Sequence, residues 1–76
     1  MMEIVTLEEA LNHSGMKNVE HKDYYYNFEY NGKKFIIRGN YSLYNFTLYI
    51  KEKDLVKTLA TNISYRTMIR KVKNYK

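Results

Sequence analysis

The chain has 76 residues, no cysteine and a formal net charge of +5 at pH 7. A chain of this length provides one small core, so we expect a single domain over residues 1–76. The lack of cysteine excludes a disulfide framework and a thiolate zinc site, and the lack of a long apolar run excludes a transmembrane helix. The start Met1-Met2-Glu3 has no basic segment for export, so the expected location is cytoplasmic.

The excess positive charge lies at the C-terminal end. Residues 1–56 contain seven Lys or Arg and eight Asp or Glu, whereas residues 57–76 contain six Lys or Arg and no acid. Charge blocks of this kind are typical of interaction segments. Lys, Asn, Tyr and Ile make up 33 of the 76 residues. Their codons are mostly A and T, which indicates an AT-rich bacterium, phage or plasmid as the source.

The first predicted element is a helix over residues 6–14. Thr6 begins a capping-box pattern, with Glu three residues later. Gly15 is the residue type that ends a helix in the left-handed conformation, and Met16 stands where a Schellman motif places its contact with Leu11. The charged stretch that follows, as far as Asp23, has no periodicity and is predicted to be a connection in which Val19 points inward.

Residues 24–50 predict a three-stranded antiparallel meander. Asn31-Gly32 between alternating apolar runs is a strong hairpin signal, and Gly39-Asn40 indicates a second loop of two or four residues. A two-residue first turn pairs Phe28 with Phe35, which sets the faces by alternation. The buried face is then predicted to hold Tyr24, Tyr26, Phe28, Phe35, Ile37, Tyr44, Phe46, Leu48 and Ile50.

The opposite face of this sheet is not simply polar. By the same alternation it carries Tyr25, Arg38, Tyr41 and Tyr49 beside Ile36 and Leu43. Tyrosine offers a large contact area at low entropic cost, and an exposed apolar patch often marks a contact surface. Two interpretations follow: this face binds a partner, or another segment of the chain, such as the last helix, covers it.

From Asp54 the apolar residues recur at helical spacing, and Asp54 is a suitable N-cap. The polar stretch around Asn62 is unfavourable for a helix, so either one helix bends there or a second helix starts at a Ser64 cap, and the break is the favoured alternative. The predicted fold is therefore α+β, in the order α-β-β-β-α-α, with the helices packed on one face of the sheet.

The last segment, residues 62–76, is predicted to be helical, amphipathic and basic. Its apolar stripe holds Tyr65, Met68, Ile69, Val72 and Tyr75. The candidate binding residues beside that stripe are Arg66, Arg70, Lys71, Lys73 and Lys76. Cations on a helix can neutralise the phosphates of a nucleic acid, can fit an acidic groove on a protein, or can form a solvated face.

The sequence offers little for catalysis. It has no phosphate-binding glycine loop and no nucleophile elbow. A site of two histidines and one carboxylate, from His13, His21 and Asp23, is one alternative. The favoured interpretation places His13 at a helix end and His21 in a loop, so we expect no enzyme, no cofactor and no metal.

The layout of a helix, a three-stranded meander and a helix is similar to that of double-stranded-RNA-binding domains and of some integrase arm-binding domains. The former carry a Lys-Lys-x-Ala-Lys cluster where this chain has Lys51-Glu52-Lys53-Asp54, so the resemblance is one of topology. The small α+β layout also resembles that of phage-encoded inhibitors of host defence, the anti-CRISPR proteins among them.

Two functions are expected from these features. The first is a phage or mobile-element accessory protein that binds stoichiometrically to a host protein or ribonucleoprotein complex that handles nucleic acid, as an inhibitor or modulator. The alternative is direct DNA or RNA binding through the basic C-terminal helix. Strand edges that invite association predict a monomer or weak homodimer, and no membrane is involved.

Overall fold

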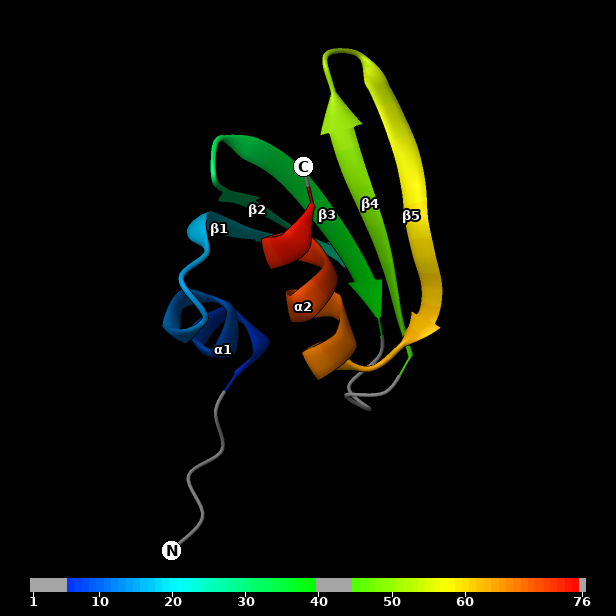
Figure 1. The fold of residues 1–76 in the computed structure, drawn as a ribbon. Coiled ribbons are helices and arrows are strands. Elements are labelled where there is room, and N and C mark those ends of the chain that lie inside the picture. Colours follow the sequence, from blue (N-terminus) through cyan, green and yellow to red (C-terminus); the bar gives the residue numbers. More distant parts are fainter. Residues whose placement is uncertain (1–5, 40–44, 76) are drawn as a thin grey trace, which may run out of the picture.

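The computed structural model describes residues 6–39 and 45–75. The protein has an α+β fold, in which two helices lie on one face of a five-stranded antiparallel sheet of order β1-β2-β3-β4-β5 (Figure 1). The elements in chain order are α1 (Leu7–His13), β1 (Lys17–Lys22), β2 (Tyr25–Tyr30), β3 (Lys33–Gly39), β4 (Phe46–Glu52), β5 (Leu55–Ile63) and α2 (Tyr65–Asn74).

The central part of the predicted meander is confirmed. Phe28 pairs with Phe35, and the two-residue turn places positive φ angles at Asn31 (54°) and Gly32 (78°). Two successive residues with positive φ are the signature of the type I′ turn that Asn-Gly favours. Ile37 faces Leu48, so the predicted alternation continues into β4. The apolar residues of the predicted buried face on β2, β3 and β4 are indeed buried.

The connection between β3 and β4 is longer than predicted. Gly39 pairs with Phe46, so neither a two-residue nor a four-residue loop starting at Gly39 closes this hairpin. The shift involves an even number of residues, so each strand keeps the face assigned to it. Tyr41, Leu43 and Tyr44 lie outside the described residues.

The segment predicted as a connection after α1 is instead an edge strand, β1. It pairs with β2 through a register shift between Lys17 and Glu20, with a positive φ of 52° at Asn18. Asp23 and Tyr24 form the turn to β2, so the prediction that Tyr24 is buried is wrong: its side chain is 80% exposed. Val19 points inward as predicted and packs on the core.

The prediction of a helix after Asp54 is also wrong. Lys53 and Asp54 form the turn of a long hairpin, and the next nine residues form the edge strand β5. The register between β4 and β5 shifts twice, between Phe46 and Leu48 and between Leu48 and Tyr49. Each shift places one extra residue in β5 and interrupts the strict alternation of faces. The apolar residues of β5 therefore recur at intervals that resemble those of an amphipathic helix.

Helix α1 ends as its sequence predicts. The Thr6 hydroxyl accepts a hydrogen bond from the amide of Glu9 at 3.2 Å. At the other end Gly15 has φ of 90°, and the amide of Met16 donates to the carbonyl of Leu11 at 3.1 Å, which is the long hydrogen bond of a Schellman motif. Both Leu11 and Met16 are buried, so the cap also attaches the helix to the core.

Helix α2 begins at the predicted second cap. The Ser64 side chain accepts from the amide of Thr67 at 3.2 Å, and the helix continues to Asn74. The alternative of a new helix capped by Ser64 is therefore correct for the last segment, although a strand and not a helix precedes it. Met68 and Val72 are buried, as the predicted apolar stripe requires.

Both helices pack on the same side of the sheet, which we call the inner face. Its residues Phe28, Phe35, Ile37, Phe46, Leu48 and Ile50 are each 1% exposed or less. The ring of Tyr75 meets Phe35 edge-on with centroids 5.9 Å apart, and Tyr65 meets Phe46 in the same way at 6.2 Å. The core is thus a layer between two helices and one face of the sheet.

A hydrogen bond joins the two helices. The Ser14 hydroxyl donates to the carbonyl of Ala10, so the Tyr65 hydroxyl, 2.9 Å from Ser14 Oγ, donates to it. Burial raises the pKa of Tyr65 above its ordinary value, and the hydrogen bond with Ser14 opposes that rise.

Since β1 and β5 extend the meander to five strands, the predicted likeness to the three-stranded layout of double-stranded-RNA-binding domains does not hold.

Candidate functional site

The side of the sheet opposite the helices, here called the outer face, is the candidate site. The core residues of α1 and α2 cluster with those of the inner face, so neither helix covers the outer one (Figure 1). The alternative that the last helix hides the outer tyrosines is therefore wrong.

The outer face is hollowed. The hollow has a volume of about 580 Å³. Asn18, Glu20 and Lys22 of β1 line it together with Val56 of β5, although these strands are the two edges of the sheet. The hollow therefore extends across the full width of the sheet, on the side opposite the helices.

Strand pairing arranges the outer side chains in three rows across the sheet. The first row runs through Lys22, Tyr25, Arg38 and Thr47. The second runs through Glu20, Asn27, Ile36, Tyr49 and Thr58. The third runs through Glu29, Lys34, Lys51 and Val56. Ile36 and Tyr49 therefore lie in the middle row, with Arg38 and Tyr25 in the row on one side and Lys34 and Lys51 in the row on the other.

Two lysines of the third row oppose each other directly. Lys34 on β3 is the cross-strand partner of Lys51 on β4. Like charges at opposed positions of a sheet are destabilising. Among the described residues, the side chains of Lys34, Lys51 and Arg38 make no ion pair or hydrogen bond. Lys34 also opposes Glu29 on β2, and the hollow is lined by four cations, Lys22, Lys34, Arg38 and Lys51, against two acids, Glu20 and Glu29. The excess charge is therefore positive and lies on β3 and β4.

The acids of the outer face belong to the first two strands and are already engaged. Glu20 lies 3.7 Å from the Lys22 ammonium, and the Glu29 carboxylate accepts a hydrogen bond from the Asn18 amide at 2.9 Å. The outer positions of β3 and β4 carry no acid: they are Lys34, Ile36, Arg38, Thr47, Tyr49 and Lys51. The half of the hollow formed by these two strands is therefore cationic.

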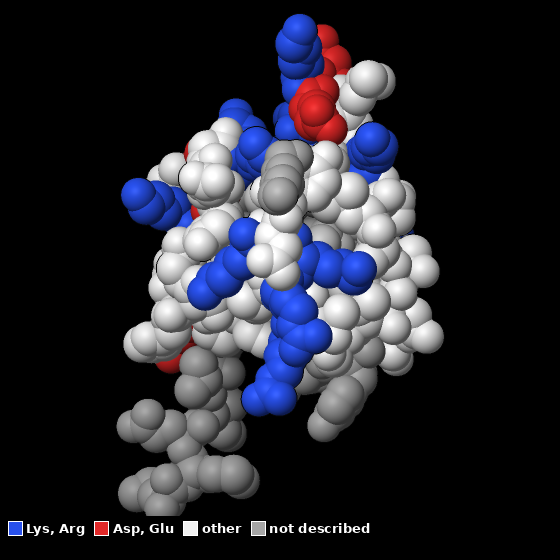
Figure 2. All heavy atoms as spheres, in the orientation of Figure 1, with Lys and Arg blue, Asp and Glu red and all other residues white. Residues whose placement is uncertain are grey.

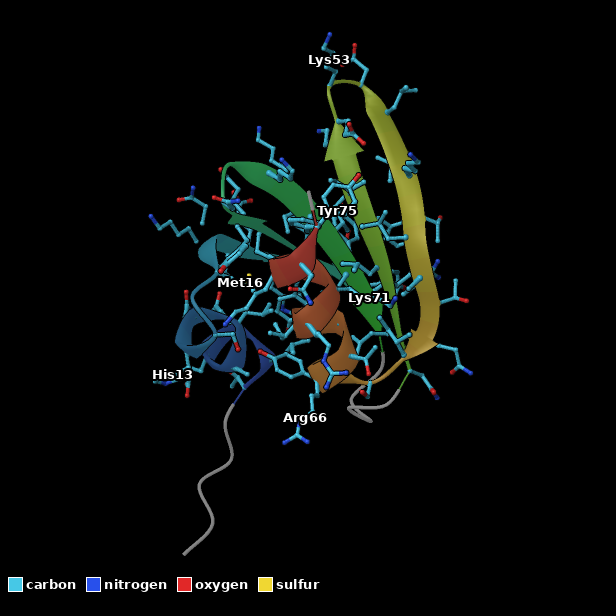
Figure 3. All side chains as sticks on the ribbon, in the orientation of Figure 1. His13, Met16, Lys53, Arg66, Lys71 and Tyr75 are labelled. Atoms are coloured by element: carbon cyan, nitrogen blue, oxygen red, sulfur yellow. The ribbon has the colours of Figure 1, made fainter. Side chains whose placement is uncertain are left out.

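The basic residues of α2 form a separate surface. Arg66, Arg70, Lys71 and Lys73 are exposed, and the view in Figure 2 shows Lys and Arg side chains gathered over this helix. In Figure 3 Arg66 projects outward near the start of α2, whereas Arg70 and Lys71 border a groove with Leu59 of β5. The predicted basic stripe and the predicted outer tyrosines thus lie on opposite sides of the molecule. Lys76 lies outside the described residues.

The three residues of the alternative metal site are distributed over different elements. His13 ends α1 and points outward (Figure 3), His21 stacks on Tyr26 at 4.2 Å between ring centroids, and Asp23 lies in the turn after β1. Within residues 6–39 and 45–75, no three His, Asp or Glu side chains are grouped so that they could hold a metal ion.

The helices of the described chain are also too short and too polar to cross a bilayer.

Several residues of the hollow were missed from the sequence. Tyr25, Arg38 and Tyr49 were found by alternation, and Lys34 had the right parity but was not singled out. Lys51 has the same parity as Tyr49, two residues earlier, so extending the alternation would have found it. Asn18, Glu20, Lys22 and Val56 could not be placed, because their strands were not predicted.

Comparison with known proteins found no matching family model, no significantly similar curated protein and no significantly similar solved structure.

Proposed function

We propose that this chain is a small accessory protein, of phage or mobile-element type, that binds stoichiometrically to a complex that handles nucleic acid. Its contact surface is the outer face. The observation that carries the proposal is the uncovered hollow, in which Tyr25 and Tyr49 lie among cations that have no partner in the described chain. An inhibitor or modulator of such a complex needs a contact surface and no catalytic group.

The composition of the outer face goes beyond what folding alone requires. A solvated sheet face needs polar residues of mixed charge, and directly opposed lysines reduce stability. The outer face has acids only on β1 and β2, and it adds Tyr25, Ile36 and Tyr49 and the opposed pair Lys34 and Lys51. Aromatic anchors with complementary charge around them are typical of binding surfaces.

A second candidate function uses α2. Arg66, Arg70, Lys71 and Lys73 are exposed and make no ion pair with other described residues. Such a surface suits direct binding of DNA or RNA by neutralising phosphates. It ranks second because cations at the end of a helix are also explained by the helix dipole, which favours Lys71 and Lys73 in the last turn.

The test is recovery of the tagged chain from a lysate of the bacterium that carries its gene, with the wild type compared with Tyr49→Ala and with Arg66→Ala. The proposal predicts a complex of fixed stoichiometry that Tyr49→Ala abolishes and Arg66→Ala preserves. The complex is then assayed for its activity on nucleic acid with and without the added chain. A complex that Tyr49→Ala preserves and Arg66→Ala abolishes would favour the second candidate.

The exposed edge of the sheet bears on the oligomeric state of the chain. We propose a monomer or weak homodimer, since β5 is an edge strand with Leu55 and Val56 exposed to 75% and 55%. Exposed edge strands of this kind pair readily with other chains.

A further inference from the structure

We propose that the outer face binds single-stranded nucleic acid. The inference rests on the proposed function and identifies the component of the nucleic-acid-handling complex that the hollow contacts. The bases stack on Tyr25 and Tyr49, and the phosphates lie near Arg38, Lys34 and Lys51.

The cations specify an anionic ligand. Lys34 and Lys51 oppose each other across β3 and β4, and Arg38 lies two rows further along β3 on the same face. Neutral or positively charged ligands would leave the repulsion between the two lysines in place. A phosphate placed between them removes it, and the release of counterions from the phosphate backbone adds to the affinity.

The tyrosines specify a ligand with planar groups. Tyr25 lies on β2 in the first row, and Tyr49 lies on β4 in the second. From the spacing of strands and of residues along them, their Cα atoms are about 12 Å apart. Ile36 lies between them on β3, so one extended strand crossing the hollow meets both rings and an apolar surface. Stacking on aromatic rings is the usual way in which single strands are bound without sequence preference.

The arrangement favours a single strand over a duplex. Bases in a duplex are stacked on one another and have no free face for a tyrosine ring. A duplex would therefore contact the lysines and leave Tyr25 and Tyr49 unused. The hollow is also bordered by side chains from both edges of the sheet, including Lys22 and Val56, which suits a narrow flexible strand.

An acidic protein is the competing ligand. Its carboxylates would satisfy Lys34, Lys51 and Arg38, but it offers few planar groups for two separate tyrosines. The acids Glu20 and Glu29 lie on β1 and β2, where Glu29 opposes Lys34, whereas neither Arg38 nor Lys51 has an acid as a cross-strand neighbour. The combination of free cations and two rings on one face is better matched by alternating phosphates and bases.

The experiment measures binding of the purified full chain to fluorescently labelled oligo-U and oligo-dT of about 12 nucleotides. Anisotropy is followed at several salt concentrations. We expect Tyr49→Ala to weaken binding by about 5- to 100-fold, the loss expected for one stacked base. We expect Arg38→Gln to weaken binding and to lower the log–log salt slope by about one.

Two matched controls separate this surface from general positive charge. Arg66→Gln makes the same chemical change as Arg38→Gln on the opposite side of the molecule, and Tyr24→Ala removes an exposed ring outside the hollow. Both should change affinity by less than about twofold at moderate salt, where exposed charges at long range are screened. Tyr49→Phe keeps the ring and should bind as the wild type does, which guards against a variant that fails to fold.

Three results would overturn the inference. Equal losses for Arg66→Gln and Arg38→Gln would mean that the charge of the whole molecule, and not the hollow, attracts the oligonucleotide. Competition by an unlabelled duplex as strong as by the single strand would exclude stacking. No binding at low salt would exclude nucleic acid as the ligand. If no oligonucleotide binds but the wild-type chain recovers a complex from lysate that Tyr49→Ala does not recover, then the proposed function is retained and the ligand of the outer face is a protein.

Discussion

The two faces of the sheet are formed by the same strands but differ in burial and composition. On the inner face Phe35 and Ile37 of β3 are buried against the helices, whereas on the outer face Lys34, Ile36 and Arg38 of the same strand line an open hollow. The inner face can be explained by apolar burial alone. The outer face cannot, because it opposes two lysines and leaves two tyrosines in the hollow.

The difference indicates which residues stabilise the fold and which are available for binding. Lys34 opposes an acid, Glu29, on β2 but a lysine, Lys51, on β4. A face selected for stability alone would place an acid on both sides, as opposite charges across strands stabilise a sheet. Substitutions on the two faces should therefore separate stability from binding.

The largest difference is expected between two adjacent isoleucines. Ile37→Ala should lower the free energy of unfolding by about 2–5 kcal/mol, because Ile37 is fully buried and its loss leaves a cavity. Ile36→Ala makes the same change on the outer face, where the side chain is half-buried, and should cost about 1 kcal/mol or less. Urea unfolding of the two variants provides the measurement, and equal costs would contradict the assignment of faces.

The next effect concerns the close contact between β3 and β4. A Cβ atom added at Gly39 would lie 2.5 Å from a ring carbon of Phe46, which is fully buried. Gly39→Ala should therefore lower the free energy of unfolding by about 1–3 kcal/mol through overpacking. Combining it with Phe46→Leu should cost less than the sum of the two single changes. Additive costs would show that the predicted overlap does not occur.

A smaller loss is expected at the turn that sets the faces. Gly32 has φ of 78° and nothing within 4 Å of an added Cβ atom, so Gly32→Val tests the backbone conformation alone. It should cost more than about 1 kcal/mol, because a β-branched residue disfavours this region. Thr58→Val at an exposed position of β5 is the control and should cost little. A neutral result at Gly32 would remove the register on which the two faces depend.

The smallest expected effect has the opposite sign. Lys51→Gln removes the repulsion with Lys34 and should raise the free energy of unfolding by about 0.2–1 kcal/mol at low salt. The gain should shrink as salt screens the charges. Lys57→Gln is the matched control, because Lys57 is exposed and faces Ile50. Destabilisation by Lys51→Gln would mean that Lys51 contributes to folding and is not held at a cost.

The central strands could be predicted because local and long-range signals agree there. Asn31-Gly32 determines the turn, and the alternation on either side of it then determines the faces of β2, β3 and β4. The caps at Thr6, Gly15 and Ser64 were likewise predictable, because each depends on residues within one helical turn.

The edge strands could not be predicted, for two physical reasons. In β1 Val19 is the only apolar residue, and the register shift next to it removes what alternation it could show. In β5 two register shifts break the alternation, so that the apolar residues of this strand recur at helix-like intervals. Their turns, Asp23-Tyr24 and Lys53-Asp54, place non-glycine residues at positive φ and carry no glycine signal.

Because β1 and β5 were not predicted, part of the candidate site was missed as well. Tyr25, Arg38 and Tyr49 lie on strands that the alternation identified, whereas the rim of the hollow comes from β1 and β5. The hollow is lined by residues from all five strands, and a three-stranded sheet gave no reason to expect it.

The most direct test of the central claim is an NMR titration of the isotopically labelled chain with unlabelled oligo-U. The account predicts that the largest amide shift changes occur in the central strands, at and around Tyr25, Ile36, Arg38, Tyr49 and Lys51. Changes in α2 should be small. Changes concentrated at Arg66, Arg70 and Lys73, with the central strands unaffected, would contradict the claim that the outer face is the binding surface.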